Sequence, residues 1–259
     1  MDSFDNTLHV VTSGGWLAID PQTGETRKFT NTDGLGTGDL YDIVRDDDGI
    51  IWIAGRGRLI RYHENEIDSY LFFGRNDELM TLYSLADDGD QIWVGTSEGL
   101  VLFSKMVDDG QIEDIFFRFG SLNPEPIVRD ILLVGDSIWL ATSNGLAVAD
   151  KSNPTLLKSY VNWTSLKPSV IYGAVFDSVT ALTRFQGDIY LGTATDLLRL
   201  DITPTDTSFF DIPALGDVNV AGIYVEGDSL VAYADGGYFI YYNENVVKYT
   251  PPELSLIHI

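Results

Sequence analysis

The stretch Ile92-Trp93-Val94-Gly95-Thr96-Ser97-Glu98-Gly99-Leu100 is one of six related phrases in this chain. The other copies run over residues 8–16, 51–59, 138–146, 189–197 and 230–237. Taking the tryptophan of the phrase as a marker, the six marker positions are His9, Trp52, Trp93, Trp139, Tyr190 and Leu230. Copies about 40 to 50 residues apart are typical of propeller blades, each a four-stranded antiparallel sheet. The repeat therefore predicts an all-β propeller of about six blades.

Each period also carries the pattern of four short strands. In the second period, apolar alternation between turn residues predicts strands over residues 40–44, 50–54, 59–62 and 67–72. An Asp-Gly or Gly-Asp pair precedes the second strand of this and each later period, and it supplies the positive φ of a tight hairpin turn. We expect the apolar residue seven to nine places before each marker to lie on the innermost strand. The marker itself is expected to pack between adjacent blades.

The ends of the chain bear on how the ring closes. The first copy opens at Leu8–Thr12, which reads as a second strand, so we expect no innermost strand before it. Propellers usually close when one terminus completes the blade begun by the other. The missing strand is then expected after Pro251-Pro252, which leaves the propeller incomplete at the C-terminus. Two alternatives stay open: the chain forms six blades of which one is incomplete, or it forms part of a larger ring.

The last six residues, Leu254-Ser255-Leu256-Ile257-His258-Ile259, match no other part of the chain. They are what a sequencing adapter encodes in one reading frame, so we expect 254–259 to be a non-native tail. A genuine terminal strand is the alternative. The predicted propeller covers residues 1–253, in repeat units of about 1–35, 36–77, 78–120, 121–175, 176–215 and 216–253.

The phrase Ile-Trp-x-Gly-Thr-x-x-Gly-Leu, preceded by Asp-x-Asp-Gly, resembles the two-component regulator propeller repeat of bacterial proteins. The match is best over residues 46–62, 87–103 and 135–149, where Gly99 and Gly145 hold the second glycine. Departures are Tyr190 and Leu230 in place of Trp, Asp196 in place of the second Gly, and Gly237 in place of Leu. The resemblance implies a periplasmic, cell-surface or secreted recognition module. In the full protein it implies a downstream histidine kinase or a sorting domain.

Composition excludes several classes of function. The 259 residues include 16 Lys and Arg against 39 Asp and Glu, for a formal charge of −23, and no Cys. Nucleic acid needs a clustered basic face, which this balance disfavours, as it disfavours anionic membrane surfaces. Without Cys, disulfides and thiolate metal sites are impossible. No apolar run approaches the length of a membrane-spanning helix, so we expect no direct membrane insertion by these residues.

Acidic clusters and histidines give no catalytic or metal motif. The cluster Asp46-Asp47-Asp48-Gly49 lacks calcium-loop spacing, because the position that needs Glu holds Gly55. We interpret such clusters as hairpin turns. With three scattered histidines, no Ser-His-Asp or metal-ligand set can be proposed. No cofactor and no metal are predicted, and an enzyme, a propeller lyase or lactonase, is kept as an alternative.

Candidate binding residues lie in the second turn of each blade and in the loops between blades. Arg56 and Arg58 could receive a carboxylate or sulfate, and two solvated arginines are the alternative. Phe73 with Arg75, and Trp163, offer rings beside polar groups for a sugar or peptide, with edge packing as the alternative. The predicted binding set is Arg56, Arg58, Phe73, Arg75, Glu98, Asn144 and Trp163; the structural markers are Trp52, Trp93, Trp139, Tyr190, Gly99 and Gly145.

The predicted function is non-catalytic recognition by an extracytoplasmic bacterial sensor or surface protein. A glycan on the loop face is the preferred ligand and a protein the next. A structural scaffold of envelope or secretion machinery, needing no small ligand, is the rival from another class.

Overall fold

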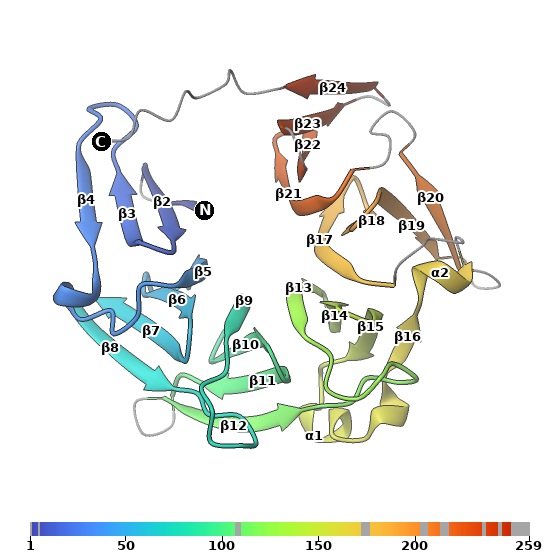
Figure 1. Ribbon diagram of the computed structural model, residues 1–259, viewed down its shortest axis with the longest axis horizontal. Helices are drawn as coiled ribbons and strands as arrows, with labels where there is room; N and C mark the ends of the chain where they lie inside the picture. The colour runs from blue at the N-terminus through green and yellow to red at the C-terminus, as the bar shows by residue number, and fades with distance from the viewer. Residues whose placement is uncertain are drawn as a thin grey trace.

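The computed structural model describes residues 2–4, 6–106, 110–171, 177–202, 207–212, 218–234, 237–242 and 245–249. In these residues, six four-stranded antiparallel sheets follow one another around a central axis, and each sheet is one blade (Figure 1). The predicted all-β propeller is confirmed. Helix is confined to short turns outside the blades, including α1 (Pro154–Leu157) and α2 (Pro168–Ile171).

The strands are numbered in chain order, four to a blade, from the axis outward. Blade 1 comprises β1 (Asp2–Phe4), β2 (Thr7–Thr12), β3 (Gly15–Ile19) and β4 (Thr26–Phe29). Blade 2 comprises β5 (Leu40–Arg45), β6 (Ile51–Gly55), β7 (Arg58–His63) and β8 (Glu66–Leu71). Blade 3 comprises β9 (Leu82–Asp88), β10 (Gln91–Thr96), β11 (Gly99–Ser104) and β12 (Gln111–Phe116). Blade 4 comprises β13 (Val128–Val134), β14 (Ser137–Thr142), β15 (Gly145–Asp150) and β16 (Thr164–Leu166). Blade 5 comprises β17 (Val179–Phe185), β18 (Asp188–Thr193), β19 (Leu197–Ile202) and β20 (Thr207–Asp211). Blade 6 comprises β21 (Val220–Glu226), β22 (Ser229–Ala234), β23 (Gly237–Tyr242) and β24 (Asn245–Tyr249).

The first blade corrects one expectation. β1 pairs antiparallel with β2, with Ser3 opposite Leu8, so an innermost strand does precede the first copy of the phrase. Three residues are too few for apolar alternation to show, which is why the pattern missed this strand. The strand expected after Pro251-Pro252 and the tail 254–259 lie outside the described residues.

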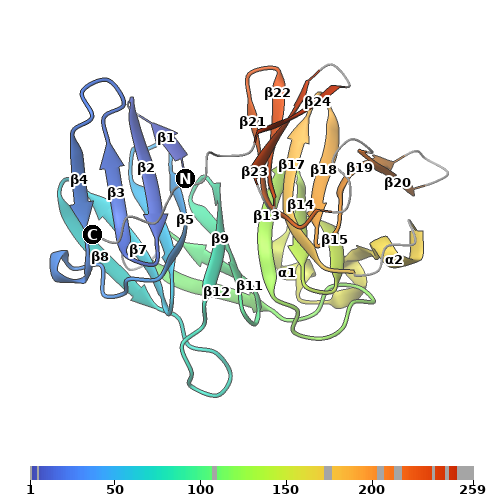
Figure 2. The same cartoon turned by 45° about the horizontal axis from the view of Figure 1, so that its top comes forward.

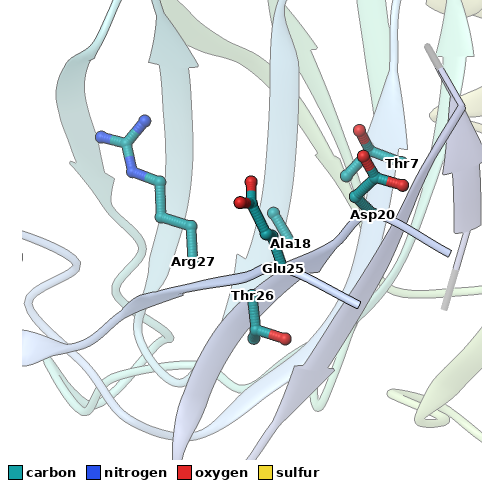
Figure 3. Close-up of a pocket in the computed structure, with 6 residues that line it drawn as sticks. All are labelled: Thr7, Ala18, Asp20, Glu25, Thr26 and Arg27. Carbon is teal, nitrogen blue, oxygen red and sulfur yellow. The ribbon is translucent and has the colours of Figure 1, made fainter. Parts of the chain in front are cut away.

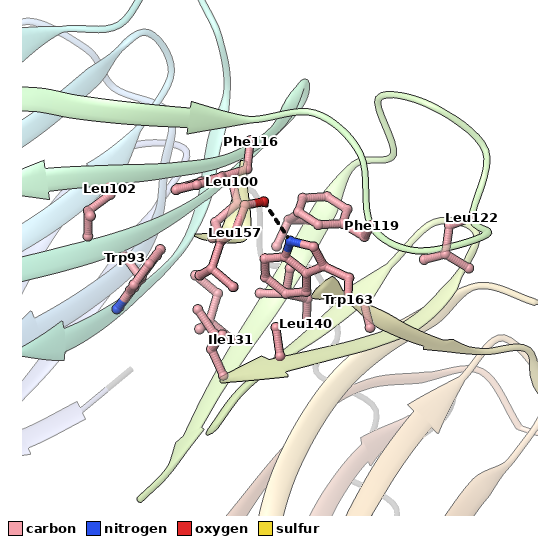
Figure 4. Packing of buried hydrophobic residues seen from close by; sticks show 14 residues of the cluster. Trp93, Leu100, Leu102, Phe116, Phe119, Leu122, Ile131, Leu140, Leu157 and Trp163 are labelled. Carbon is pink, nitrogen blue, oxygen red and sulfur yellow. Dashed lines mark hydrogen bonds between the residues drawn. The ribbon is translucent and has the colours of Figure 1, made fainter. Parts of the chain in front are cut away.

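The hydrophobic core lies between adjacent blades, and the marker side chains are among its largest buried residues. Trp52, Trp93 and Trp139 each sit on the second strand of a blade and pack against the next blade along the chain. Trp93, for example, is fully buried in a cluster with Ile131 and Leu140 of blade 4 (Figure 4). Each blade therefore has a trailing face, which carries the marker, and a leading face, which receives the marker of the blade before it.

The marker assignment in blade 6 was wrong by one residue. Leu132 pairs with Trp139 in blade 4, and the equivalent pair in blade 6 joins Tyr224 to Val231. Val231 is thus the counterpart of the tryptophan, and Leu230 belongs to the leading face, where it packs with Tyr190 of blade 5. A one-residue slip moves a side chain to the other face of a sheet, and no Gly-Thr pair follows in this copy to set the register.

The acidic turns tie neighbouring blades together. The Trp52 indole donates to Asp46 Oδ2 at 2.8 Å, and Lys105 of blade 3 donates to the same oxygen at 3.0 Å and to Asp87 at 2.8 Å. Burial opposes the charge on Asp46, but the hydrogen bonds from Trp52 and Lys105 outweigh it and hold the pKa of that carboxyl below its usual value. Asp46 also accepts from the Asp48 and Ile50 amides, so its carboxylate serves both its own turn and the contact with blade 3.

The same arrangement recurs one blade later. Trp93 Nε1 donates to Asp88 at 3.0 Å, and Lys151 of blade 4 donates to both oxygens of that carboxylate at 2.7 and 2.9 Å.

Across the described part of the chain, no helix has the length and apolarity that crossing a membrane requires.

Candidate functional site

A bulge at the start of the innermost strand in blades 2 to 6 builds one mouth of the central channel. The pairing of β5 with β6 skips Tyr41, and the equivalent pairing skips one residue in each later blade. A bulged residue leaves the ladder and is re-aimed, here toward the axis. The bulged residues, in order around the ring, are Tyr41, Tyr83, Arg129, Thr180 and Ala221, and all five line cavities at the mouth. We call these five the mouth residues.

Two tyrosines form the aromatic part of the mouth. The rings of Tyr41 and Tyr83 meet edge to face, with centroids 5.3 Å apart, and Tyr41 is 45% exposed. Burial, Asp39 and Tyr83 raise the pKa of Tyr41, while the charge of Arg56 lowers it. Arg56 therefore lies within electrostatic reach of this ring. A tyrosine hydroxyl can both donate and accept a hydrogen bond.

Two arginines lie near the tyrosine pair, Arg56 in the β6–β7 turn of blade 2 and Arg129 at the bulge of blade 4. Both side chains belong to exposed residues, and neither has a hydrogen-bond or ion-pair partner among the described residues. By contrast, Arg75 pairs with Glu125, and Arg58 donates to Ser69. Two unpaired guanidinium groups are notable in a chain of charge −23. Arg129 thus lines the mouth beside the two rings, and the charge of Arg56 reaches Tyr41.

Below the mouth, carboxylates bind backbone amides of the next blade. Asp42 accepts from the Leu85 amide at 2.7 Å, and Asp130 accepts from the Leu182 amide at 2.7 Å. Burial and the charge of Asp42 raise the pKa of Asp130 to about 7, although its bonds from backbone amides oppose the rise. Because both Asp130 oxygens already accept amide hydrogens, this group serves first to hold blade 5 against blade 4.

The channel behind the mouth is a cavity of about 710 Å³. The two aspartates and the first four mouth residues line it together with blade 6. A second hollow of about 480 Å³ lies over Tyr41, Tyr83, Arg129 and Asn219 at the surface. The volumes suit a ligand of a few sugar rings or a short peptide. In the part of the chain that the structure describes, no three His, Asp or Glu side chains are placed to hold a metal ion.

The predicted binding residues separate into different places. Arg56 lies within electrostatic reach of Tyr41 but does not line either cavity at the mouth, whereas Arg58 packs over Gly36 and donates to Ser69 Oγ at 2.9 Å. Phe73 is 49% exposed on the hairpin that projects between β8 and β9, beside Leu79, which is 48% exposed (Figure 2). Asn144 lies in the β14–β15 turn, where its backbone N–H donates to Thr142 Oγ1.

Arg75 and Glu98 come together, but in a way that leaves little free charge. The Arg75 amide donates to Glu98 Oε2 at 3.1 Å, while its guanidinium group pairs with Glu125 and lies 4.0 Å from the Phe117 ring centroid. The guanidinium group is therefore already neutralised, unlike that of Arg129.

Trp163 does not lie on the surface that a ligand could reach. Its side chain is 4% exposed, its indole donates to the Leu157 carbonyl at 3.0 Å, and its ring packs edge to face on Phe119 at 4.8 Å (Figure 4). The edge-packing alternative describes this position, because the segment that interrupts the repeat folds back with α1 over blades 3 and 4.

Another hollow, of about 490 Å³, lies at the outer edge of blade 1 and gives no convergent site. Figure 3 shows Asp20, Glu25 and Arg27 spread along its rim rather than aimed at one point. Asp20 accepts from the Gln22 and Thr23 amides, which lower its pKa, and Arg27 donates to Tyr62 and Asn65. These groups serve the local turn and the contact with blade 2.

No protein-family model matches the sequence, and none of the curated proteins compared with it is similar enough to count as a match. Solved structures do share the fold. The extracellular domain of the hybrid two-component system BT3049 from B. thetaiotaomicron is 15% identical, with a TM-score of 0.74 over 96% of this chain and 33% of that chain. That of the one-component system BT4673 from the same organism is 20% identical, with a TM-score of 0.65 over 81% and 27%. PorZ, a surface component of the type-IX secretion system of Porphyromonas gingivalis, is 15% identical, with a TM-score of 0.69 over 96% and 32%.

The chain thus spans about a third of the length of these structures. At such identities the likeness concerns the fold, and function has to be argued from the site. The structural likeness nonetheless agrees with the repeat: this propeller resembles those of two-component regulators in fold as well as in sequence.

Proposed function

We propose that this propeller is a non-catalytic recognition module that binds an anionic saccharide at the channel mouth. The observation that carries the proposal is Arg129, which lines the mouth beside Tyr41 and Tyr83 and has no side-chain partner among the described residues; Arg56, likewise without one, lies near Tyr41.

The chemistry of these groups suits a ring that bears a carboxylate or sulfate. A guanidinium fork binds such an anion through two parallel charge-assisted hydrogen bonds, which are about twice as strong as neutral ones. The exposed edge and face of Tyr41 offer apolar contact to the C–H surface of a sugar, and its hydroxyl can bond ring substituents. The chain has 39 acidic side chains, and those away from the mouth repel an anion, which concentrates binding at the mouth.

A protein ligand is the second candidate, and a different feature favours it. Phe73 and Leu79 expose apolar side chains together on the projecting hairpin between β8 and β9 (Figure 2). Exposed aromatic residues on a projecting loop are typical anchors in protein interfaces. The hairpin lies on the same face as the mouth, because both belong to the end of the blades where innermost strands begin.

We also propose that the module works outside the cytoplasm, in a sensor or surface protein. The extracellular and surface roles named for BT3049 and PorZ support this location. A scaffold role in envelope machinery predicts no saccharide binding at all, so the binding experiment separates the two functions.

The test is binding of uronic-acid and sulfated oligosaccharides, beside neutral ones of equal length, to the wild type and to Arg129→Ala. The control is Arg184→Ala, an exposed arginine without a described partner at the opposite end of an innermost strand. Loss of a charge-assisted contact, about 1.5 to 3 kcal/mol, corresponds to affinity lower by about tenfold or more.

We expect acidic oligosaccharides to bind the wild type and Arg184→Ala alike, and to bind Arg129→Ala about tenfold more weakly. Added salt should weaken the wild-type complex, because the arginines are exposed. Equal binding of neutral oligosaccharides, or equal loss in both variants, would refute an anionic site at the mouth.

A further inference from the structure

A row of polar side chains lies in the channel, each one residue after a mouth residue. The row consists of Asp42, Ser84 and Asp130, from blades 2, 3 and 4, and all three line the channel cavity. Each pairs with a small residue at the same place on the second strand of its blade, so the three lie at one level in the ring. Blades 5 and 6 have Ala181 and Gly222 at this level, which leaves room opposite the row. We call Asp42, Ser84 and Asp130 the polar row.

Ser84, in the middle of the polar row, has a hydroxyl group that the fold does not satisfy. The residue is 3% exposed, and Ser84 Oγ has no hydrogen-bond partner among the described residues. The aspartates on either side each accept a backbone amide of the next blade, which the shorter serine does not. Buried polar groups are as a rule hydrogen-bonded, because an unmade bond costs free energy. An orphan hydroxyl that lines a cavity therefore indicates that a bound molecule completes its hydrogen bonds.

Asp130 can take further hydrogen-bond donors from the cavity. Each of its carboxylate oxygens accepts one backbone amide, from Ile131 and from Leu182. An ionised carboxylate offers about four acceptor sites, so about two remain on this side chain. Asp130 is half-buried, and the cavity that it lines gives a ligand access to those sites.

The charge of the cavity lining favours a cation over a neutral group. The charged residues that line it are three acids, Asp42, Asp130 and Glu226, and one arginine, Arg129 at the mouth. Burial and the charge of Asp42 raise the pKa of Asp130 to about 7, so both oppose the ionised carboxylate. A positive group placed beside Asp130 would offset both effects.

A primary ammonium group suits the polar row better than a metal ion does. It has three donors and no acceptor, and the row offers carboxylate oxygens and a hydroxyl oxygen that can accept. Calcium takes six to eight oxygen ligands, several of them usually carboxylates. In the described part of the chain, no three acidic or histidine side chains are placed to supply such a set.

We propose that the channel interior is an ammonium subsite at the polar row, and that the acidic saccharide bound at the mouth carries a free amino group. The ammonium subsite stands on the polar row alone, whereas the saccharide as its bearer rests on the proposed function. The ligand is then zwitterionic: its anionic group binds Arg129, and its amino sugar enters the channel and donates to Ser84 and Asp130.

The test is isothermal titration at pH 7 with three disaccharides that share one glucose skeleton and differ in one kind of substituent. Chitobiose carries amino groups, N,N′-diacetylchitobiose carries acetamido groups, and cellobiose carries hydroxyl groups. None of the three bears an acid, so they probe the channel without the mouth. Trialanine serves as a peptide amine. The proteins are the wild type, Asp130→Asn, Ser84→Ala and Arg129→Ala, with Asp47→Asn as the control for an exposed acid at the other end of the strand.

We expect the wild type to bind chitobiose about tenfold or more tightly than the other two disaccharides and trialanine, and Asp130→Asn to lose that preference. Ser84→Ala should weaken chitobiose binding by about threefold without lowering the melting temperature, because its hydroxyl has no protein partner to lose. This variant keeps the test decisive if Asp130→Asn does not fold. Asp47→Asn should bind like the wild type.

Arg129→Ala separates this inference from the proposed function. It should keep the preference for chitobiose while it loses acidic oligosaccharides, so either proposal can fail without the other. Equal binding of the three disaccharides, an unchanged preference in both Asp130→Asn and Ser84→Ala, or an equal loss in Asp47→Asn would overturn the ammonium subsite. Trialanine bound as tightly as chitobiose would overturn the amino sugar as its ligand.

Discussion

Lys105 offers a direct test of how the blades are tied together. Its side chain is 10% exposed and bridges Asp46, which is 1% exposed, to Asp87 across the contact between blades 2 and 3. In Lys105→Met the aliphatic stem can still pack, but two carboxylates are left facing each other without their cation. Removing one partner of a buried ion pair costs about 3 to 5 kcal/mol, because the remaining charge stays desolvated.

We expect the free energy of unfolding to fall by about 3 kcal/mol, the lower end of that range, because Trp52 still donates to Asp46. Urea unfolding followed by tryptophan fluorescence reports the change, since Trp52 lies at this contact. The matched control is Lys158→Met. Lys158 is 54% exposed in its pair with Asp114 at 2.7 Å, and exposed pairs contribute about 1 kcal/mol or less.

The loss of stability in Lys105→Met should also depend on pH. Lys105 lowers the pKa of Asp46 in the wild type, so that carboxylate stabilises the fold above its unfolded pKa and the benefit is lost as pH falls through the folded value. In Lys105→Met the carboxylates become easier to protonate, so the destabilisation should shrink between pH 8 and pH 5. A Lys158→Met variant as unstable as Lys105→Met, or a loss that does not change with pH, would refute the reasoning.

Three further predictions concern single positions. Burial raises the pKa of Asp130 to about 7, above its unfolded value, so this group's contribution to stability is lost as pH rises through 7. In Asp130→Asn the melting temperature should therefore change less between pH 5 and pH 8 than in the wild type. The same pH profile in both proteins would contradict the raised pKa of Asp130. Trp163→Ala should cost about 3 to 5 kcal/mol in urea unfolding, while Phe73→Ala should cost less than about 1, because only the first removes a buried ring. Gly95→Ala should destabilise by about 1 to 3 kcal/mol, since its Cβ would come within 2.9 Å of the Val128 carbonyl, whereas a Cβ on Gly222 meets nothing within 4 Å; equal melting temperatures for the two variants would show that blades 3 and 4 are not closely packed there.

Much of the fold follows from the repeat, because each period carries its own turn signals and its own marker. Where Gly and Thr follow Trp93, the register of the second strand is set and the burial of the marker is predictable. In blade 6 these residues are replaced, and the marker was placed at Leu230 instead of Val231. The short strand at Asp2–Phe4 carries no alternation, so only its pairing reveals it.

The candidate site was less predictable, because it depends on bulges. Arg129 precedes Asp130 in sequence like any surface arginine, and only the skipped pairing turns it toward the channel. A signal does exist: aligned repeats place Tyr41, Tyr83 and Arg129 in one column, two residues before the innermost apolar residue. Trp163 shows the reverse case, where an attractive residue type in an irregular segment proves to be core.

Hydroxyl-radical footprinting with and without a uronic-acid oligosaccharide tests whether an acidic saccharide binds at the channel mouth. We expect protection of Tyr41 and Tyr83, with no change at Tyr160, which is 49% exposed at the outer edge of the ring. Protection that appears at the Phe73 hairpin or at Tyr160 while Tyr41 stays reactive would show that the saccharide does not bind at the mouth.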